Sequence, residues 1–346
     1  MNRLLIQIGL LIATAIRVQA EAPSLSTTVE VPFSGSNAFS YPFPILDRQQ
    51  RRAFAVGNAF FKDNWVQAPS SSRGRDGLGP FFNARSCSTC HPKDGRGRPM
   101  EKNGEKETGL LFRLPQPHAL FGSQIQDLAL PSLEPEGTID VQWEETEGHY
   151  ADGTPYSLVR ANHRLSGSVS KSPPLLPRIA PHLIGLGLLE SIPLTSLQKA
   201  ADPEDADGDG ISGRLRLVPE INSGKQLPGR FGWKSEQPTV EQQVARAFQQ
   251  DLGITSPLFP HENTTPAQKG AIDRTHSGGA PEIDAHKLQR VVFYSQTLAI
   301  PARRNPEDPT VRQGEALFRQ LQCARCHQTD QTVGAFPPLP ELEGLV

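Results

Sequence analysis

The chain has 346 residues, of which 36% are hydrophobic and 21% charged, so it is long enough for two domains and too polar for a bundle of membrane helices. Its formal net charge of −2 argues against nucleic acid as a partner, because the basic residues are scattered among acids. The 32 prolines and 30 glycines, with no sustained period around them, predict long ordered loops between modest helices.

The first segment of the chain has the pattern of a secretory signal peptide. A short positive start precedes an apolar stretch over 4–16, and the residues at 18–20 predict cleavage after Ala20. The apolar stretch is too short to span a bilayer, and no other segment comes close. We therefore expect residues 1–20 to be removed and residues 21–45 to form an N-terminal extension. The mature protein is expected in the periplasm, with no stable membrane span.

Two Cys-x-x-Cys-His motifs contain all four cysteines of the chain. Their residues are Cys87, Cys90, His91, Cys323, Cys326 and His327. Two thiols at this spacing reach the two vinyl groups of one porphyrin, and the adjacent histidine binds the iron as its proximal ligand. Disulfides, a shared zinc ion or a thioredoxin-like pair are the alternatives, but none of them explains a histidine directly after each cysteine pair. We therefore expect two covalently attached haems c, with His91 and His327 as iron ligands.

Methionine, the usual distal ligand of an electron-transfer cytochrome c, is nearly absent. Removal of the signal peptide leaves only Met100, which follows His91 so closely that the chain has little room to cross to the far face of the first haem. At least one haem is therefore expected to have a different distal ligand or an open position. An open position is what chemistry with peroxide or oxygen requires.

A weak internal repeat precedes the two motifs. Gly57 and Gly314 lie in predicted helices over 51–66 and 311–322, and each is followed four positions later by a phenylalanine. We expect each glycine to let another helix approach closely and each phenylalanine to pack near a haem edge. The first copy has an insert, 67–85, between its helix and its motif.

Residues 109–165 have a different pattern. Short β-like runs at 109–114, 139–143 and 156–159 are separated by Gly, Pro and Asp-Gly turns, which predicts a small antiparallel insert.

The apolar, glycine-punctuated stretch 183–189 is either core or backbone laid against a haem face. It ends at Glu190, which we consider as an acid–base group for splitting peroxide, although a structural role at a helix end is more common for such a residue. Trp233 is considered as a relay between haems, and a core position is again the more common one. Amphipathic patterns over 239–252 and 285–299 predict two further helices.

An acidic loop matches the start of a calcium-binding loop. Its alternating carboxylates are Asp205, Asp207 and Asp209. A glycine at the sixth position allows a sharp turn, but the twelfth position holds Arg216 where an EF-hand has a bidentate glutamate. The loop is therefore either a shorter calcium site, closed by a group such as Asp202 or Glu204, or a solvated acidic turn.

Together these elements predict a mainly α fold made of cytochrome c-like domains with long loops and a small antiparallel β insert. We assign 46–305 to a first cytochrome c-like haem domain with inserts and 306–346 to the start of a second. Only residues 328–346 follow the second motif, and a proline-rich stretch at 337–340 cannot form the missing helices. We therefore expect the second domain to be truncated.

Five segments carry a resemblance to a known family. They are DGLGPFFNARSC at 76–87, DGRG at 94–97, GLGLLE at 185–190, DADGDGISGR at 205–214 and GRFGWK at 229–234. In these segments the chain resembles the bacterial di-haem c-type oxidoreductases, often labelled thiol oxidoreductases. That family is distantly similar to di-haem cytochrome c peroxidases and to the di-haem enzyme that matures methylamine dehydrogenase.

The resemblance runs from about residue 46 to the end of the chain and implies a periplasmic di-haem redox enzyme with two cytochrome c domains. It implies haem attachment at both Cys-x-x-Cys-His motifs. The thiol label fits badly, because each cysteine is then taken by a haem, and the family's chain continues past the point where this one stops.

Our first hypothesis is a di-haem oxidoreductase of peroxidase type. One haem reacts with an oxidant, and the other passes in electrons from a small periplasmic electron-transfer protein. The alternatives are a non-catalytic electron-transfer cytochrome and an inactive fragment of such an enzyme.

Overall fold

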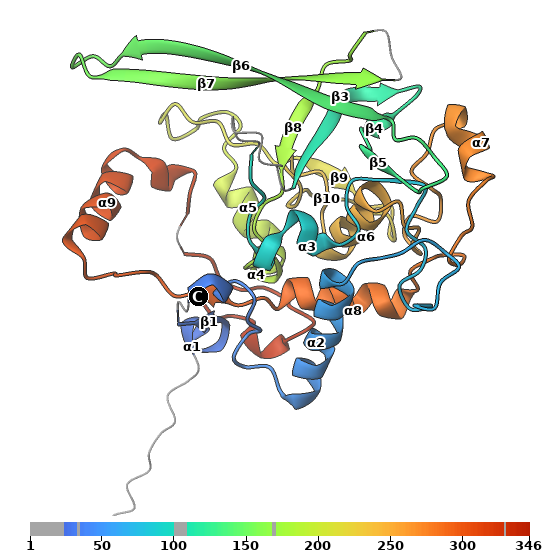
Figure 1. Ribbon diagram of the computed structural model, residues 1–346. Coiled ribbons are helices and arrows are strands. Elements are labelled where there is room, and N and C mark those ends of the chain that lie inside the picture. The colour runs from blue at the N-terminus through green and yellow to red at the C-terminus, as the bar shows by residue number, and fades with distance from the viewer. Residues whose placement is uncertain (1–23, 33–34, 100–108, 168–170, 329) are drawn as a thin grey trace, which may run out of the picture.

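The computed structural model describes residues 24–32, 35–99, 109–167, 171–328 and 330–346 (Figure 1). The predictions made for the signal peptide and for Met100 concern residues outside these ranges. Within the described part of the chain, most helices pack around one main core, and a smaller core lies beneath a long β-hairpin.

The helices and strands follow one another along the described part of the chain. The helices are α1 (Leu25–Val29), α2 (Arg48–Lys62), α3 (Cys87–Cys90), α4 (Leu186–Ser191), α5 (Leu194–Ala200), α6 (Val240–Asp251), α7 (Lys269–Ile272), α8 (Ala285–Gln296) and α9 (Pro309–Gln320). The strands are β1 (Glu30–Val31), β2 (Phe81–Phe82), β3 (Leu110–His118), β4 (Gly122–Gln124), β5 (Leu128–Ala129), β6 (Gly137–His149), β7 (Pro155–Gly167), β8 (Leu176–Ile179), β9 (Leu217–Pro219), β10 (Gln226–Pro228) and β11 (Ile300–Pro301).

The fold is mixed α/β, and the prediction of a mainly α fold is wrong. Helices take up 30% and strands 21% of the structure. Many strands have only two or three residues, too few to show an alternating pattern in the sequence. The hairpin β6–β7 has 13 residues in each strand, but its outer half is exposed on both faces. Neither face of this half is buried, so the apolar run at 156–159 that predicted a strand lies largely exposed there.

The helices of the main core were the most predictable elements. α6 is capped by the side chain of Thr239, which accepts a hydrogen bond from Gln242 N, as its sequence pattern indicates. α2 begins earlier than predicted because Asp47 and Gln50 form a capping box. None of the described helices combines the length and the apolar character needed to cross a membrane.

α2 and α8 cross at very short range in the main core (Figure 1). A Cβ atom at Gly57 would collide with the backbone oxygen of Arg290 and with the Cβ of Tyr294. The expectation that this glycine lets another helix approach is therefore confirmed. Phe54 and Phe61, one turn to either side, pack against the Tyr294 ring in tilted orientations at centroid distances of 4.6 and 5.2 Å.

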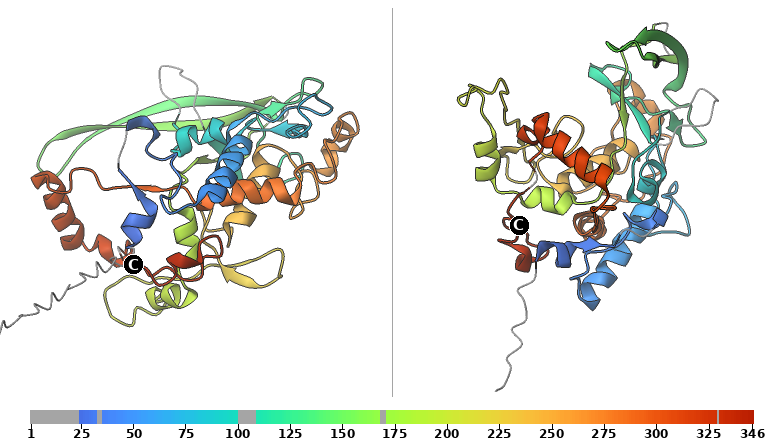
Figure 2. Two further views of the ribbon diagram at one scale, coloured as in Figure 1. Left: turned by 90° about the horizontal axis from the view of Figure 1, so that it is seen from below. Right: turned by 90° about the vertical axis from the view of Figure 1, so that its left-hand side faces the viewer.

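The C-terminal segment returns to the main core after the second motif. Val333, Phe336, Leu339 and Leu342 are all buried there. Before the motif, β11 pairs in parallel with β1 near the N-terminal end of the described chain. The C-terminus consequently lies beside α1 and β1, whereas α9 stands away from the body of the molecule (Figures 1 and 2).

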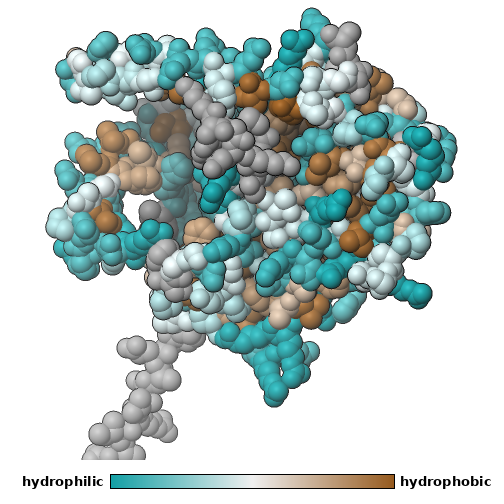
Figure 3. Space-filling model, viewed as in Figure 1, coloured by the Kyte–Doolittle hydropathy of each residue, from teal (hydrophilic) through white to brown (hydrophobic). Residues whose placement is uncertain are grey.

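A three-stranded sheet, in the order β4–β3–β8, joins the main core to the hairpin. Its outer face packs under the base of the hairpin and forms the smaller core. That core consists of Phe112, Leu114, Phe121, Ile125 and Leu165. Beyond this base the hairpin projects over the molecule and is largely hydrophilic at its surface (Figure 3). The predicted antiparallel insert is present and is larger than expected.

Candidate functional site

A cavity of about 550 Å³ lies between α3, α6 and the inner face of the β4–β3–β8 sheet. The first motif supplies part of its wall with Cys87, Cys90 and His91. Apolar side chains, among them Phe61 and Leu183, line it further. The cavity therefore joins all three potential haem-binding side chains of the first motif to a largely apolar space.

The single turn of α3 fixes the geometry of the first motif. His91 N donates to Cys87 O at 2.9 Å, which closes the turn and keeps Cys87 and Cys90 on neighbouring positions of one helical face. Ser88 Oγ donates to Lys62 O at 2.9 Å and ties the turn to the end of α2. The helix before the motif thus positions the motif itself.

The His91 ring interacts with the backbone of Pro181 and with that of Gly95. Its Nδ1 lies 2.7 Å from Pro181 O, and a carbonyl oxygen can only accept, so Nδ1 carries the proton. The lone pair of Nε2 is then available for a metal ion. Burial lowers the pKa of His91, which favours the neutral ring that metal coordination needs.

The thiols of the first motif are held in their protonated form. Burial, with a smaller contribution from the Asp251 carboxylate, raises the pKa of Cys90 to about 12 and raises the pKa of Cys87 as well. Thiol redox catalysis needs a lowered cysteine pKa, so this site has the wrong electrostatics for it. All four cysteines are unpaired, so the disulfide interpretation finds no support.

A buried tyrosine–carboxyl pair supports the loop that follows the motif. Tyr294 of α8 donates a 2.6 Å hydrogen bond from its hydroxyl to Asp94 Oδ1. Burial raises the pKa of both groups. Asp94 N donates a hydrogen bond to His91 O, and Asp94 O accepts one from Leu183 N. The second bond holds the apolar stretch 183–189 against the cavity.

Glu190 lies behind the cavity lining, and both of its oxygens have partners. Oε1 accepts from Val240 N at 2.7 Å at the start of α6, and Oε2 accepts from Gln296 Nε2 at 2.5 Å in α8. This arrangement joins α4, α6 and α8. The acid–base role considered for Glu190 stays a prediction, and its geometry matches the structural role.

Trp233 lies at the rim of the cavity. Its side chain is 53% exposed, and its indole N–H donates to Ile179 O at 2.7 Å. It also borders a second, apolar hollow of about 460 Å³ beneath the hairpin, which Trp143 helps to line. It is therefore not a core residue.

The second motif lies at the surface, after α9. Cys323 is partly buried, but Cys326 and His327 are exposed, and no residue of α9 is buried. Phe318 lies 6.1 Å from the His327 ring, in the position expected from the repeat. Unlike its counterpart Gly57, Gly314 contacts no other helix. The α9 arm thus shows apolar side chains on its surface (Figure 3).

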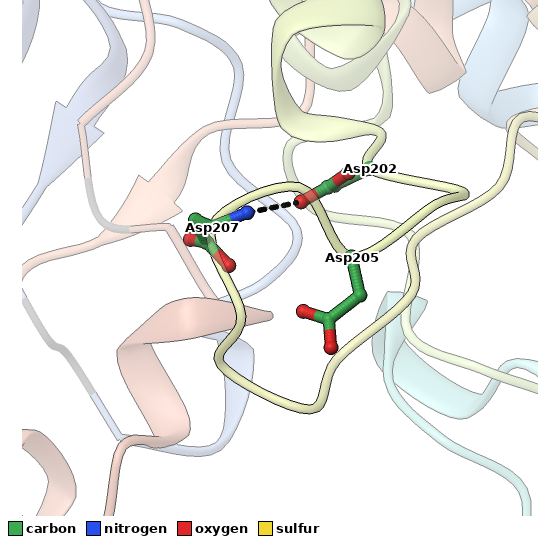
Figure 4. A group of neighbouring side chains, drawn as sticks. All are labelled: Asp202, Asp205 and Asp207. Carbon is green, nitrogen blue, oxygen red and sulfur yellow. Dashed lines mark hydrogen bonds between the residues drawn. The ribbon is translucent and has the colours of Figure 1, made fainter.

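The acidic loop lies against the second motif. Asp202, Asp205 and Asp207 each offer a carboxylate oxygen, and these oxygens all lie within 4.8 Å of one another (Figure 4). Asp202 also accepts hydrogen bonds from the backbone of the loop, including one of 3.4 Å from Asp207 N. Arg325, between the two cysteines of the second motif, pairs with Asp207 at 3.1 Å and with Asp209 at 2.9 Å. The loop therefore connects the second motif to the body of the molecule.

Comparison with known proteins agrees with the motif geometry. Residues 17–122 and 151–337 match the model of a family described as "di-haem oxidoreductase, putative peroxidase". The matched residues include both Cys-x-x-Cys-His motifs. The chain belongs to this family. No curated protein and no solved structure matched the chain.

The di-haem oxidoreductase family implies two haems per chain, and the first site fits one of them. Cys87 and Cys90 offer two protonated thiols on one turn, and His91 lines the same cavity. More of the cavity lining is apolar than polar, as suits the porphyrin ring of a haem. When bound, the haem would supply the iron at which an oxidant can react.

Sequence reasoning missed a buried polar network on the side of this cavity formed by α6. Gln124 Nε2 donates to Asp251 Oδ1 and to Asn83 Oδ1, each at 2.8 Å. Behind it, Gln126 N donates to the Glu136 carboxylate at 2.6 Å. Burial raises the pKa of Glu136 to about 7, the range of general acid–base groups. The sequence feature that could have revealed this network is the polar run 249–251. It ends a predicted helix, one face of which is otherwise apolar.

Proposed function

We propose that this di-haem oxidoreductase holds a covalent haem c at the first motif and reduces peroxide there. Cys87 and Cys90 would form the thioethers, and His91 would be the proximal iron ligand. The observation that carries the proposal is the convergence of these three side chains on one apolar cavity, with His91 Nδ1 bonded to Pro181 O. The protonated, buried state of both thiols also favours thioether attachment over thiol chemistry.

The reaction proposed is the reduction of one peroxide by two electrons and two protons to two waters. The residues of the chain would orient and protect the site in this reaction. The hydrogen bond to Pro181 O holds the His91 ring and raises its basicity toward the metal. Phe61, Leu183 and Leu186 line the cavity and limit the access of water. The network around Gln124 and Asp251 offers buried groups that can hold a proton.

The second motif is proposed as the site where electrons arrive from a small periplasmic electron-transfer protein. Cys326 and His327 are exposed on the α9 arm, so a haem c attached there would be within reach of a docking protein. Its connection to the body through Arg325 and the acidic loop restricts its position relative to the first site.

The first experiment is an intact mass together with a pyridine haemochrome spectrum, after expression with the c-type maturation machinery. We expect two haems per chain. Cys87→Ser with Cys90→Ser should remove one, and Cys323→Ser with Cys326→Ser should remove the other. Absence of haem on exported protein would overturn the proposal and favour the alternatives for the cysteine pairs, such as disulfides or a shared zinc ion.

Rapid mixing with hydrogen peroxide then separates an enzyme from a carrier. The peroxidase proposal predicts high-spin iron at one site and a fast spectral change when peroxide is added. Two closed, six-coordinate sites with no reaction would instead identify a non-catalytic electron-transfer cytochrome.

We also propose that the acidic loop binds calcium. The support is the group of oxygen ligands from Asp202, Asp205 and Asp207, since calcium prefers carboxylate oxygens. Titration calorimetry with calcium chloride on the haem-loaded chain should give one site that Asp205→Asn weakens at least tenfold. Asp140→Asn, an exposed substitution on β6, is the matched control. Equal binding in both variants would leave the loop as a solvated acidic turn.

Export to the periplasm is proposed from the N-terminal sequence pattern. Cell fractionation should recover the mature chain, starting after Ala20, with periplasmic markers. Recovery of uncleaved chain with the cytoplasmic fraction would contradict it.

A further inference from the structure

The inner face of the β4–β3–β8 sheet presents charged side chains to the cavity. Leu111 and Arg113 of β3 line the cavity, as do Leu176 and Arg178 of β8, which lie opposite them in the register. Phe112 points to the other face and packs in the smaller core. Strand alternation therefore places two arginines on the cavity wall rather than on the solvent surface.

β3 runs from the first motif toward the far end of the cavity. Gly109, immediately before the strand, lies against the backbone of Cys90. At about 3.3 Å per residue, Arg113 is roughly 13 Å further along the strand. A haem bound through Cys87 and Cys90 has its thioethers on one porphyrin edge and its two propionates on the opposite edge. Arg113 is thus at the end of the cavity where the propionates would lie.

The guanidinium of Arg113 is fixed on one side and available on the other. Its NH1 donates to Gln124 Oε1 at 3.0 Å and to Gln250 Oε1. Its NH2 forms an ion pair with Glu236 Oε2 at 3.6 Å, a distance too long for a hydrogen bond. A guanidinium has five N–H donors, so the NH2 side can still bind an incoming carboxylate.

The cavity lining has a surplus of positive charge. Among the described lining residues there are four basic side chains, Arg113, Arg178, Lys234 and Arg246, against two acidic ones, Glu236 and Asp251. The difference is two positive charges. One haem brings two propionate carboxylates, which would balance this surplus in a partly buried space where unpaired charge is costly.

We propose that Arg113, with Arg246 beside it, is the carboxylate-binding site of this cavity and receives the propionates of the first haem. This inference rests on the proposed attachment of haem at the first motif. Arg246 comes from α6, where it donates to Gln249 at 2.9 Å and lies over the Phe259 ring at 5.0 Å. Sheet and helix therefore each contribute one preorganised cation.

The test is a spectroelectrochemical titration of the haem-loaded full-length chain, together with resonance Raman spectra of the propionate bending modes. The variants are Arg113→Gln, which removes the charge, and Arg113→Lys, which keeps it. Arg164→Gln on the exposed part of β7 is the matched control. Circular dichroism and the pyridine haemochrome spectrum establish that each variant is folded and carries haem.

A cation near the propionates favours reduction, because reduction adds negative charge to the haem. Arg113→Gln should therefore lower the midpoint potential of the first haem by at least about 59 mV. For one electron, this shift is a tenfold change in the reduction equilibrium constant. Arg113→Lys should shift it less, and Arg164→Gln should leave it unchanged. The propionate modes should shift in Arg113→Gln alone.

Three outcomes would separate the possible failures. An unchanged potential and unchanged propionate modes in folded, haem-loaded Arg113→Gln would overturn the inference. Weaker binding of fluoride or azide with an unchanged potential would also overturn it, because Arg113 would then act on the iron's distal ligand. A wild-type chain without haem at Cys87 and Cys90 would overturn the proposed function instead.

Discussion

Glu136 is a single buried carboxyl group whose ionisation couples stability to pH. It is 5% exposed, and its two oxygens accept hydrogen bonds from Gln126 N and Gln268 Nε2, each at 2.6 Å. Burial raises its pKa from 4.5 to about 7 despite these bonds. Between these two pH values the folded protein holds a proton that the unfolded chain has lost, so the free energy of unfolding falls as pH rises.

Replacing Glu136 by Gln should therefore flatten the pH dependence of stability. In the wild type we expect Glu136 to lower the free energy of unfolding by up to roughly 3 kcal/mol between about pH 4.5 and 7. Glu136→Gln, which cannot ionise, should lose that slope. Urea unfolding at a series of pH values measures it. The exposed Glu134→Gln should keep the wild-type slope, and an equal slope in Glu136→Gln would contradict the assignment.

For single residues, a site can be predicted from the sequence only when its members lie close together along the chain. Cys87, Cys90 and His91 form one turn, so their spacing alone predicts their chemistry. The polar network joins Gln124 to Asp251, which are far apart in the chain, and no local pattern brings them together. Glutamines are also common at surfaces, so their types carry little information until burial is known.

At the scale of elements, the two copies of the sequence repeat have different surroundings. Gly57 of α2 is covered by α8, whereas a Cβ at Gly314 of α9 would meet nothing within 4 Å. The same residue therefore serves close helix packing in one copy and weakens an exposed helix in the other. Alanine substitution should have opposite effects on the two.

Gly57→Ala should lower the free energy of unfolding by about 1–3 kcal/mol, because its Cβ collides with backbone that cannot move freely. Gly314→Ala should leave it unchanged or raise the helicity of α9, since alanine is favoured over glycine by about 1 kcal/mol in a helix interior. Denaturant unfolding and far-ultraviolet circular dichroism measure the two effects. Equal effects of the two substitutions would mean that the packing of α2 on α8 is not specific.

The helices and the long strands β3, β6 and β7 were predictable and the short strands were not, for physical reasons. α6 and α8 each bury one face and begin at a capping side chain, Thr239 and Asp284. The helical spacing of the apolar residues and the capping residue therefore predict the same element. β9 and β10 pair only three residues each, and β1 finds its partner β11 at the other end of the chain. Such strands are defined by their neighbours in space, which a local sequence window does not contain.

At the scale of the whole molecule, the segment that carries the second motif is attached to the main core at both ends. β11 pairs with β1 before it, and Val333 to Leu345 packs into the core after it. Between these attachments, the described residues of α9 and the motif are not buried in the core. The predicted division at residues 305 and 306 stays a prediction, but part of the C-terminal region packs into the main core, against which Cys87 also packs.

This attachment predicts that core stability depends on residues beyond the second motif. Leu339 is fully buried, so Leu339→Ala should lower the free energy of unfolding of the whole protein by about 2–5 kcal/mol. Leu321 is 70% exposed on the arm, and Leu321→Ala should change it by less than about 0.5 kcal/mol. Urea unfolding followed through the first haem measures both.

Limited proteolysis tests the same architecture without mutation. Trypsin should cut first in the exposed arm, at Arg312 or Arg319, while the core resists. The two fragments should then co-elute in native gel filtration, because Phe336, Leu339 and Leu342 hold the C-terminal fragment in the core. Fragments that separate at once would mean that the C-terminal segment is only loosely attached. The cavity beside the first motif would then be complete without it.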